Sequence, residues 1–127
     1  MRKRSVYYYL RGYNCTQCII KAAEERYNLD IPKECYDLCK GLNVGLGIGG
    51  TCNLISAATM VFGLLFDERT VRRLRIRFID TFQSNYKAVN CSQLRKLRDC
   101  QNNCSYIIGE AAYLIEKLIE NEEKALN

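Results

Sequence analysis

The chain has eight cysteines and no histidine among its 127 residues, so thiols are its only soft metal ligands and its strongest nucleophiles. A protein can oxidise so many thiols to disulfides, bind a metal or cluster with them, cycle them as redox groups, or bury some as small apolar side chains. Any chemistry performed here is therefore expected to be sulfur chemistry. Hydrolase activity is disfavoured, because histidine, the commonest general base, is missing.

Two cysteine pairs have the spacing of neighbours on a helix. Cys15 and Cys18 form a Cys-x-x-Cys motif. This motif is typical of a redox dithiol, of half a zinc or iron–sulfur site, or of two buried small residues. Cys35 and Cys39 lie one helical turn apart beside apolar positions, where burial in the core is as well supported as metal ligation.

Three further cysteines lie near expected helix starts. Cys100 and Cys104 flank the predicted start of the last helix, and Cys52 follows two glycines at the start of the predicted central helix. Free amides at a helix N-terminus favour a thiolate, and hydrogen bonds to sulfur stabilise the charge of a cluster. The glycine segment lacks the Lys-Ser/Thr ending of a nucleotide-binding loop, so phosphate binding is disfavoured.

Apolar residues recur at helical spacing along most of the chain, and capping residues mark the helix starts. A short helix through residue 98 and a last helix from residue 102 or 103 to residue 124 are also expected. The main expected boundaries are Asn14 and Asp30 as caps of the first and second helices, Gly41 as the end of the second, Thr51 or Cys52 as the start of the central helix, and Asp67 as the cap of the fourth.

These features predict a single all-α domain, a bundle of about five to six helices with a glycine-rich loop before the central helix. A chain of this length buries roughly two-thirds of its unfolded surface. Residues 73–78 alternate as a strand would, but Leu74, Phe78 and Phe82 continue a helical stripe. Residues 1–12 are expected to form a basic, tyrosine-rich N-terminal arm, and residues 13–127 the helical cysteine-rich domain.

No charged residue occurs in residues 42–66, so a membrane-spanning helix has to be considered. Glycines crowd the first half of this run, and the remaining dozen or so residues have the length of a buried core helix. No membrane span is therefore predicted. The N-terminus has no apolar stretch for a secretory signal, so we expect a cytoplasmic protein, in which stable disulfides are rare.

The formal net charge is +5, and one dense basic cluster lies on the predicted fourth helix. A solvated helix face is the simplest explanation. Nucleic-acid binding is disfavoured, because no reader motif accompanies the charge. The cluster consists of Arg69, Arg72, Arg73, Arg75 and Arg77.

Four short segments carry a resemblance to a known family: Tyr-Asn-Cys-Thr-Gln at 13–17, Gly-Gly-Thr-Cys at 49–52, Val-Asn-Cys at 89–91 and Cys-Ser-Tyr-Ile-Ile-Gly-Glu-Ala-Ala at 104–112. With them the chain resembles, from about residue 13 to residue 119, the redox-active proteins named for the pattern C-GCAxxG-C-C. The match departs at the naming motif, where Asn53, Leu54 and Ser56 replace its small residues. This family is similar to the non-haem portion of split-Soret cytochromes, where four cysteines are associated with an iron–sulfur centre.

The resemblance implies a set of cofactor ligands. The family's four hallmark cysteines fall on Cys15, Cys52, Cys91 and Cys104, which would hold one iron–sulfur cluster. Cys18 and Cys100 would be candidate extra ligands, while Cys35 and Cys39 would be additions of this protein. Haem is not expected, because the chain lacks a Cys-x-x-Cys-His motif.

The leading hypothesis is an iron–sulfur or related metal-cluster protein that transfers electrons or senses redox state. One alternative is a thiol–disulfide redox protein that uses cysteine pairs without metal, and another is a helical binding module with buried cysteines. A four-cysteine zinc site is less favoured, because the close cysteine pairs lie on predicted helices rather than on knuckles. Enzymatic activity is left open, and a redox partner protein and a homo-oligomer are the candidate partners.

Overall fold

The computed structural model describes residues 1–98 and 104–126. Regular structure in these ranges is helical, apart from one isolated β-bridge. The elements are α1 (Arg2–Tyr9), α2 (Cys15–Arg26), α3 (Lys33–Leu38), the π-helical turn η1 (Gly45–Gly49), α4 (Asn53–Leu65), α5 (Glu68–Tyr86), α6 (Cys91–Arg98) and α7 (Ser105–Leu126).

The all-α prediction is confirmed, but the expected count of five to six helices is too low. Seven α-helices and one π-helical turn occupy the described ranges. One difference is α1, which lies in the segment expected to be an arm and packs against α2 and α7. The other is η1, because the glycine-rich segment coils into a tight turn instead of an open loop. The division of the chain at residue 12 stays a prediction.

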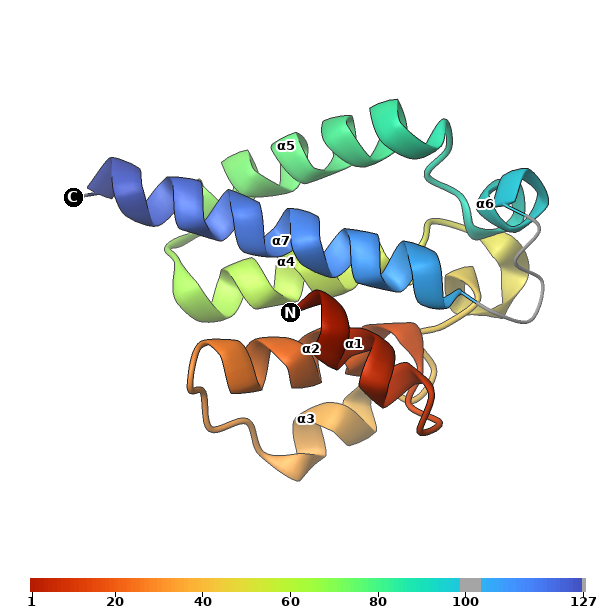
Figure 1. Ribbon diagram of the computed structural model, residues 1–127, viewed down its shortest axis with the longest axis horizontal. Coiled ribbons are helices and arrows are strands. Elements are labelled where there is room, and N and C mark those ends of the chain that lie inside the picture. The colour runs from red at the N-terminus through yellow and green to blue at the C-terminus, as the bar shows by residue number, and fades with distance from the viewer. Residues whose placement is uncertain (99–103, 127) are drawn as a thin grey trace.

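The predicted central helix α4 lies at the centre of the packing. It contacts α2, α5 and α7, and its Ala57, Ala58, Val61 and Phe62 are fully buried. Figure 1 shows the long helix α7 with α5 along one side of it and α1 and α2 along the other, while α6 and η1 lie together at one end. None of the helices in the described ranges combines the length and apolar character needed to cross a membrane.

Helix α5 confirms that the alternating segment is helical. Leu74, Phe78 and Phe82 are fully buried, and the Phe78 and Phe82 rings stack with centroids 5.6 Å apart. The five arginines of the basic cluster lie on the exposed side of the same helix. Helical periodicity over several turns therefore outweighs the short alternation.

Helix caps follow the sequence closely at two starts. The Asn14 side-chain oxygen accepts from the Gln17 amide at 2.9 Å, while the Gln17 side-chain oxygen accepts from the Asn14 amide at 3.0 Å, which completes a capping box. Asp67 caps α5 by accepting from the Thr70 amide at 3.0 Å.

The second helix is shorter than predicted at both ends. Helix α3 begins at Lys33, after Pro32, instead of following a cap at Asp30, and ends at Leu38. The reason is that the Ile31 amide donates to the Glu24 carboxylate of α2 at 2.8 Å, so this stretch is fixed to α2 outside the helix. The expected start of the last helix at residue 102 or 103 lies outside the described residues.

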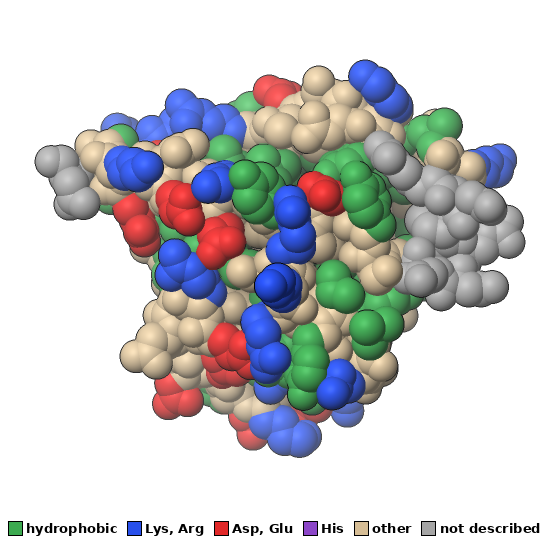
Figure 2. Space-filling view, viewed as in Figure 1, with side chains coloured by type: hydrophobic (Ala, Val, Ile, Leu, Met, Phe, Trp, Pro, Cys, Tyr) green, Lys and Arg blue, Asp and Glu red, His purple; other side chains and the backbone are tan. Residues whose placement is uncertain are grey.

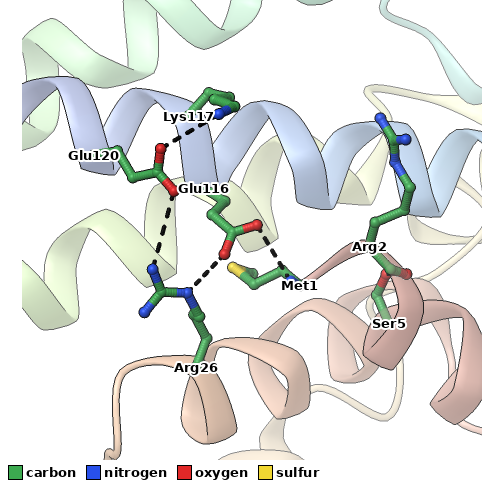
Figure 3. A network of polar contacts seen from close by, with 7 residues as sticks. All are labelled: Met1, Arg2, Ser5, Arg26, Glu116, Lys117 and Glu120. Carbon is green, nitrogen blue, oxygen red and sulfur yellow. Dashed lines mark hydrogen bonds and ion pairs between the residues drawn. The ribbon is translucent and has the colours of Figure 1, made fainter.

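Ion pairs attach the N-terminal helices to α7. Arg26 of α2 donates to Glu116 at 2.7 Å and lies 4.0 Å from Glu120 (Figure 3). The Met1 amino group lies 3.3 Å from the other oxygen of Glu116. Figure 2 shows acidic and basic side chains interleaved over this face of the molecule, with apolar side chains beside them. The ion pairs thus hold α2 and the start of α1 against α7, the helix that follows Cys104.

Candidate functional site

Four cysteines from distant parts of the chain line one cavity of about 40 Å³. They are Cys15, Cys52, Cys91 and Cys104, the four that the family resemblance implies as ligands. The remaining lining is largely apolar and includes a single basic side chain. It consists of Val44, Asn53, Leu54, Leu94, Arg95 and Ile107.

Each of the four thiols lies at the N-terminus of a helix. Cys15 and Cys91 are the first residues of α2 and α6, and Cys52 is the N-cap of α4. Cys104 directly precedes α7, and its carbonyl accepts from the Ile108 amide at 3.0 Å. Four helix N-termini therefore meet at one small cavity, and each of them carries a partial positive charge. This arrangement favours negative charge on the sulfurs.

A β-bridge fixes two of the four cysteines relative to each other. Thr51 and Asn90 form the bridge. The Cys52 amide donates to the Val89 carbonyl at 2.8 Å, and the Cys91 amide donates to the Gly50 carbonyl at 2.7 Å. Cys52 and Cys91 therefore flank the bridge on either side, each held by a backbone bond to the opposite segment, although the chain between them contains all of α4 and α5.

The other two cysteines are positioned by contacts from separate elements. The Cys15 thiol lies 3.9 Å from the Leu42 carbonyl, which also accepts from the Thr16 hydroxyl at 2.6 Å. The Cys104 amide donates to the Tyr9 hydroxyl of α1 at 3.1 Å. The contribution of Tyr9 was missed by sequence reasoning, and a run of three tyrosines in an assumed arm gave no signal for it.

The turn η1 approaches the cavity in an unusual backbone conformation. Val44, which lines the cavity, and Leu46 both have positive φ, at 51° and 59°. Such values are strained for a β-branched or bulky residue. Asn53, which is 4% exposed, offers its side-chain oxygen to the Gly45 amide at 3.0 Å and the Leu46 amide at 3.4 Å. Asn53 was also missed, and the available signal was a polar residue opening an otherwise apolar helix.

Close packing against α6 fixes the end of η1. Gly49 has a φ of 69°, and a Cβ at this position would lie 2.9 Å from the Ser92 Cβ. Because real Cβ contacts of this length essentially do not occur, only glycine fits here without a shift of α6. The turn and the helix that carries Cys91 therefore pack as one unit.

Burial favours the neutral form of two of the cavity thiols, Cys52 and Cys15. It raises the pKa of Cys52 to about 12, against a hydrogen bond from the Leu54 backbone that acts in the other direction. Burial also raises the pKa of Cys15, and the Cys91 thiol adds to this effect. At Cys15 and Cys52 backbone amides lower the pKa as expected, but burial outweighs them and favours the neutral form of these two thiols.

The remaining cysteines do not line the cavity where the structure describes them. Cys18 is fully buried, its thiol donates to the Tyr13 carbonyl at 3.5 Å, and burial raises its pKa to about 12. Cys39 lies in a second small core and donates to the Cys35 carbonyl at 3.2 Å, while Cys35 is half-buried. The alternative that Cys35 and Cys39 lie in the core is thus met by Cys39. Cys100 lies outside the described residues.

The donor set is informative about which metal group would fit. Over residues 1–98 and 104–126, no three cysteine or carboxylate side chains are gathered tightly enough to hold one metal ion. A single zinc needs all its sulfurs at about 2.3 Å from one centre, whereas each cysteine of an iron–sulfur cluster binds its own position on a larger group. Four thiols without a carboxylate among the lining residues are a donor set that both kinds of site use.

Comparison with known proteins decides the family. A profile described as "Putative redox-active protein (C_GCAxxG_C_C)" matches residues 13–118. The chain belongs to this family. The comparisons with curated proteins and with solved structures gave no match. In this member of the C_GCAxxG_C_C family, the matched region includes all four cysteines of the cavity.

Proposed function

We propose that this protein binds an iron–sulfur cluster through Cys15, Cys52, Cys91 and Cys104 and serves in electron transfer or redox sensing. The observation that carries the proposal is the convergence of these four thiols, from four separate helices, on one cavity. An iron–sulfur cluster supplies one-electron chemistry when bound. We include in the proposal a cytoplasmic location, where thiols stay reduced, and a redox partner protein.

The protein would contribute charge stabilisation. Four cysteine thiolates bring four negative charges into a mostly apolar cavity, and burial alone would oppose them. The N-termini of α2, α4 and α6 and the start of α7 offset this cost through their partial positive charge. Backbone amides near sulfur, such as that of Leu54 beside Cys52, are the kind of donor that adjusts the potential of a cluster.

The apolar lining would contribute exclusion of water. Leu54, Leu94 and Ile107 are buried side chains at the cavity wall. Limited solvent access protects bound sulfide and iron and shifts the reduction potential. Val44, the N-cap of the π-helical turn, lines the same cavity, so its strained backbone belongs to the site.

A metal-free dithiol function has weaker support. The Cys-x-x-Cys partner of Cys15 is Cys18, which is fully buried and engaged with the Tyr13 carbonyl. Disulfide exchange requires attack in line with an accessible sulfur. The Cys18 sulfur is buried and contacts the Tyr13 carbonyl, so it is poorly placed for such an attack. The pair is therefore better suited to a structural role in α2 than to disulfide exchange.

The test is purification without oxygen, followed by visible spectroscopy and by measurement of iron and acid-labile sulfide per chain. We expect a coloured protein with stoichiometric iron and sulfide. Cys52→Ser and Cys91→Ser should each lose the colour and most of the iron. Cys35→Ser is the matched control, because Cys35 is outside the cavity and half-buried, and it should retain both.

Three results would count against the cluster. Protein that stays colourless after anaerobic reconstitution with iron and sulfide would exclude it. Stoichiometric zinc without sulfide would point to a four-thiolate zinc site, and equal iron in wild type, Cys52→Ser and Cys91→Ser would remove these cysteines from the ligand set. Colourless, metal-free protein would leave the dithiol function as the better explanation.

A further inference from the structure

A second cavity, separate from the thiols, lies between α2, α3 and the segment that joins α1 to α2. Its volume is about 650 Å³, within the range of small-molecule pockets, and it is open to solvent. None of the four cavity cysteines lines it. We refer to it below as the α2–α3 cleft.

The cleft carries an excess of positive charge. Its basic side chains are Arg11, Lys21, Lys33 and Lys40, against two carboxylates, Glu24 and Asp37. A lining with two more positive than negative side chains favours a negatively charged ligand.

Both carboxylates are already engaged by the protein. Asp37 lies 2.9 Å from Lys33 and 3.3 Å from Lys40. Glu24 accepts from the Ile31 amide at 2.8 Å with one oxygen and from the Tyr36 hydroxyl at 3.0 Å with the other. The Glu24 oxygens are therefore directed at the walls of the cleft, and the charge of Asp37 is offset by two lysines.

Two of the basic groups keep capacity for a ligand. Lys21 lies 3.9 Å from Glu24, beyond hydrogen-bond distance. Arg11 stacks on the Tyr7 ring at 3.6 Å, and in the described part of the chain it forms no ion pair. A guanidinium stacked on a ring keeps its in-plane donors available, which suits a carboxylate or a phosphate.

Aromatic side chains give the cleft an apolar wall. Tyr36 is 7% exposed, and the Lys21 ammonium lies 4.2 Å from its ring centroid and 5.9 Å from that of Tyr13. Both rings line the cleft beside Ile31. Aromatic and aliphatic side chains with a few convergent polar groups are the usual composition of a ligand pocket.

From this geometry we infer that the α2–α3 cleft is a binding site for a small organic anion, one with a planar or apolar body and a phosphate or carboxylate group. The body would lie against Tyr13 and Tyr36, and the acidic group would meet Arg11 and Lys21. Gln17 lines this cleft from the same first turn of α2 that presents Cys15 to the thiol cavity. The two cavities thus share the N-terminal turn of α2.

The experiment is isothermal titration calorimetry of the full chain with adenosine monophosphate, benzoate, adenosine and inorganic phosphate as probes. We expect at least one of the two organic anions to bind more tightly than inorganic phosphate and more tightly than neutral adenosine. Lys21→Gln should weaken that binding about tenfold or more, as expected for loss of one charge-assisted hydrogen bond. Whether the monophosphate or benzoate binds better shows which of the two combinations of body and acidic group the cleft prefers.

Lys124→Gln is the matched control, because Lys124 is an exposed lysine at the end of α7 and lies outside the cleft. It should leave binding unchanged. Lys40→Gln is a second cleft variant, and because this side chain is 71% exposed, its replacement should leave the fold intact. Absence of binding by both organic anions at millimolar concentration would overturn the inference, as would equal weakening by the cleft variants and Lys124→Gln.

Discussion

The side-chain oxygen of Asn53 accepts a hydrogen bond from the backbone amide of Gly45 at 3.0 Å. This bond joins the first residue of α4 to the first residue of η1, and it is fully buried. The same oxygen receives the Leu46 amide at 3.4 Å. A single side chain thereby holds a backbone stretch in which Val44 and Leu46 have positive φ. It acts together with the Gly47 and Gly49 amides, which both donate to the Val44 carbonyl, to oppose the strain of this stretch.

Asn53→Ala should destabilise the protein by about 1–3 kcal/mol, because it leaves a buried backbone amide without its acceptor. Urea unfolding followed by circular dichroism measures the change. Asn121→Ala is the control, since Asn121 is exposed on α7 and its replacement should cost less than about 0.5 kcal/mol. Equal stability of both variants would show that Asn53 does not restrain η1.

Gly49→Ala should cost more stability than Gly47→Ala, although both glycines have positive φ, at 69° and 79°. Both variants share the conformational cost of a side chain at such angles. Only the alanine at position 49 meets α6, at the Ser92 Cβ, whereas position 47 faces open space. The difference should be about 1–3 kcal/mol, the usual cost of overpacking, measured by urea unfolding.

A second substitution tests the cause of that difference. In the Gly49→Ala background, Ser92→Gly removes the atom that the new Cβ would meet. Its effect should be smaller there than in the wild-type background. Additive effects of the two substitutions would place the strain of Gly49→Ala elsewhere.

Arg73 should matter more for stability than its neighbours in the basic cluster. Arg73 donates to Glu122, a carboxylate only 7% exposed, whereas Arg72 pairs with the exposed Glu68. Arg73→Gln should therefore cost about 1.5–3 kcal/mol, because a buried charge loses its partner.

The control for Arg73 is the double variant Arg72→Gln with Arg75→Gln, at two exposed positions of α5. It should change the free energy of unfolding by less than about 1 kcal/mol. A double variant that fails to fold would contradict the assignment of these arginines to the solvated face of α5.

Acid should remove a stabilising contribution from Glu25. The Arg4 guanidinium donates to its two oxygens at 2.7 and 3.0 Å, and together with the Tyr8 hydroxyl it lowers the pKa of Glu25 from 4.5 to about 2. A carboxyl with a lowered pKa stabilises the fold above its unfolded value and loses that contribution as the pH falls toward its folded value.

The difference in unfolding free energy between wild type and Glu25→Gln should therefore be constant above about pH 5 and shrink between pH 4.5 and about 2. Because the pair is half-exposed, the difference should be small and should decrease in high salt. A difference that grows on acidification would reverse the assigned direction of the pKa shift.

Local signals in the sequence predicted most of the helices. Asn14 and Asp67 supplied caps, and the stripe through Leu74 and Phe78 separated helix from strand over several turns. The misplaced start of α3 arose because Glu24 binds the Ile31 amide from another helix. No local pattern contains such a contact.

The cysteine set came from the resemblance to a family rather than from spacing, because the four thiols are brought together only by tertiary packing. The same limit explains the missed residues. Tyr9 contacts Cys104 across nearly the whole length of the chain, and Asn53 acts on the turn that precedes it in the sequence. Both acquire their roles from partners that residue type alone does not specify.

The bridge between Thr51 and Asn90 joins the segments of Cys52 and Cys91 into one unit. The four cysteines therefore come from three parts of the fold: this unit, α2 and the start of α7. The bridge closes a loop that contains α4 and α5, and the entropy of that closure is paid once for Cys52 and Cys91 together. The backbones of these two residues are then fixed relative to each other, while Cys15 at the start of α2 and Cys104 before α7 supply the other two thiols. The four thiols therefore depend on three separately folded parts of the chain, and the bridge ties two of the four to each other before α2 and α7 are considered.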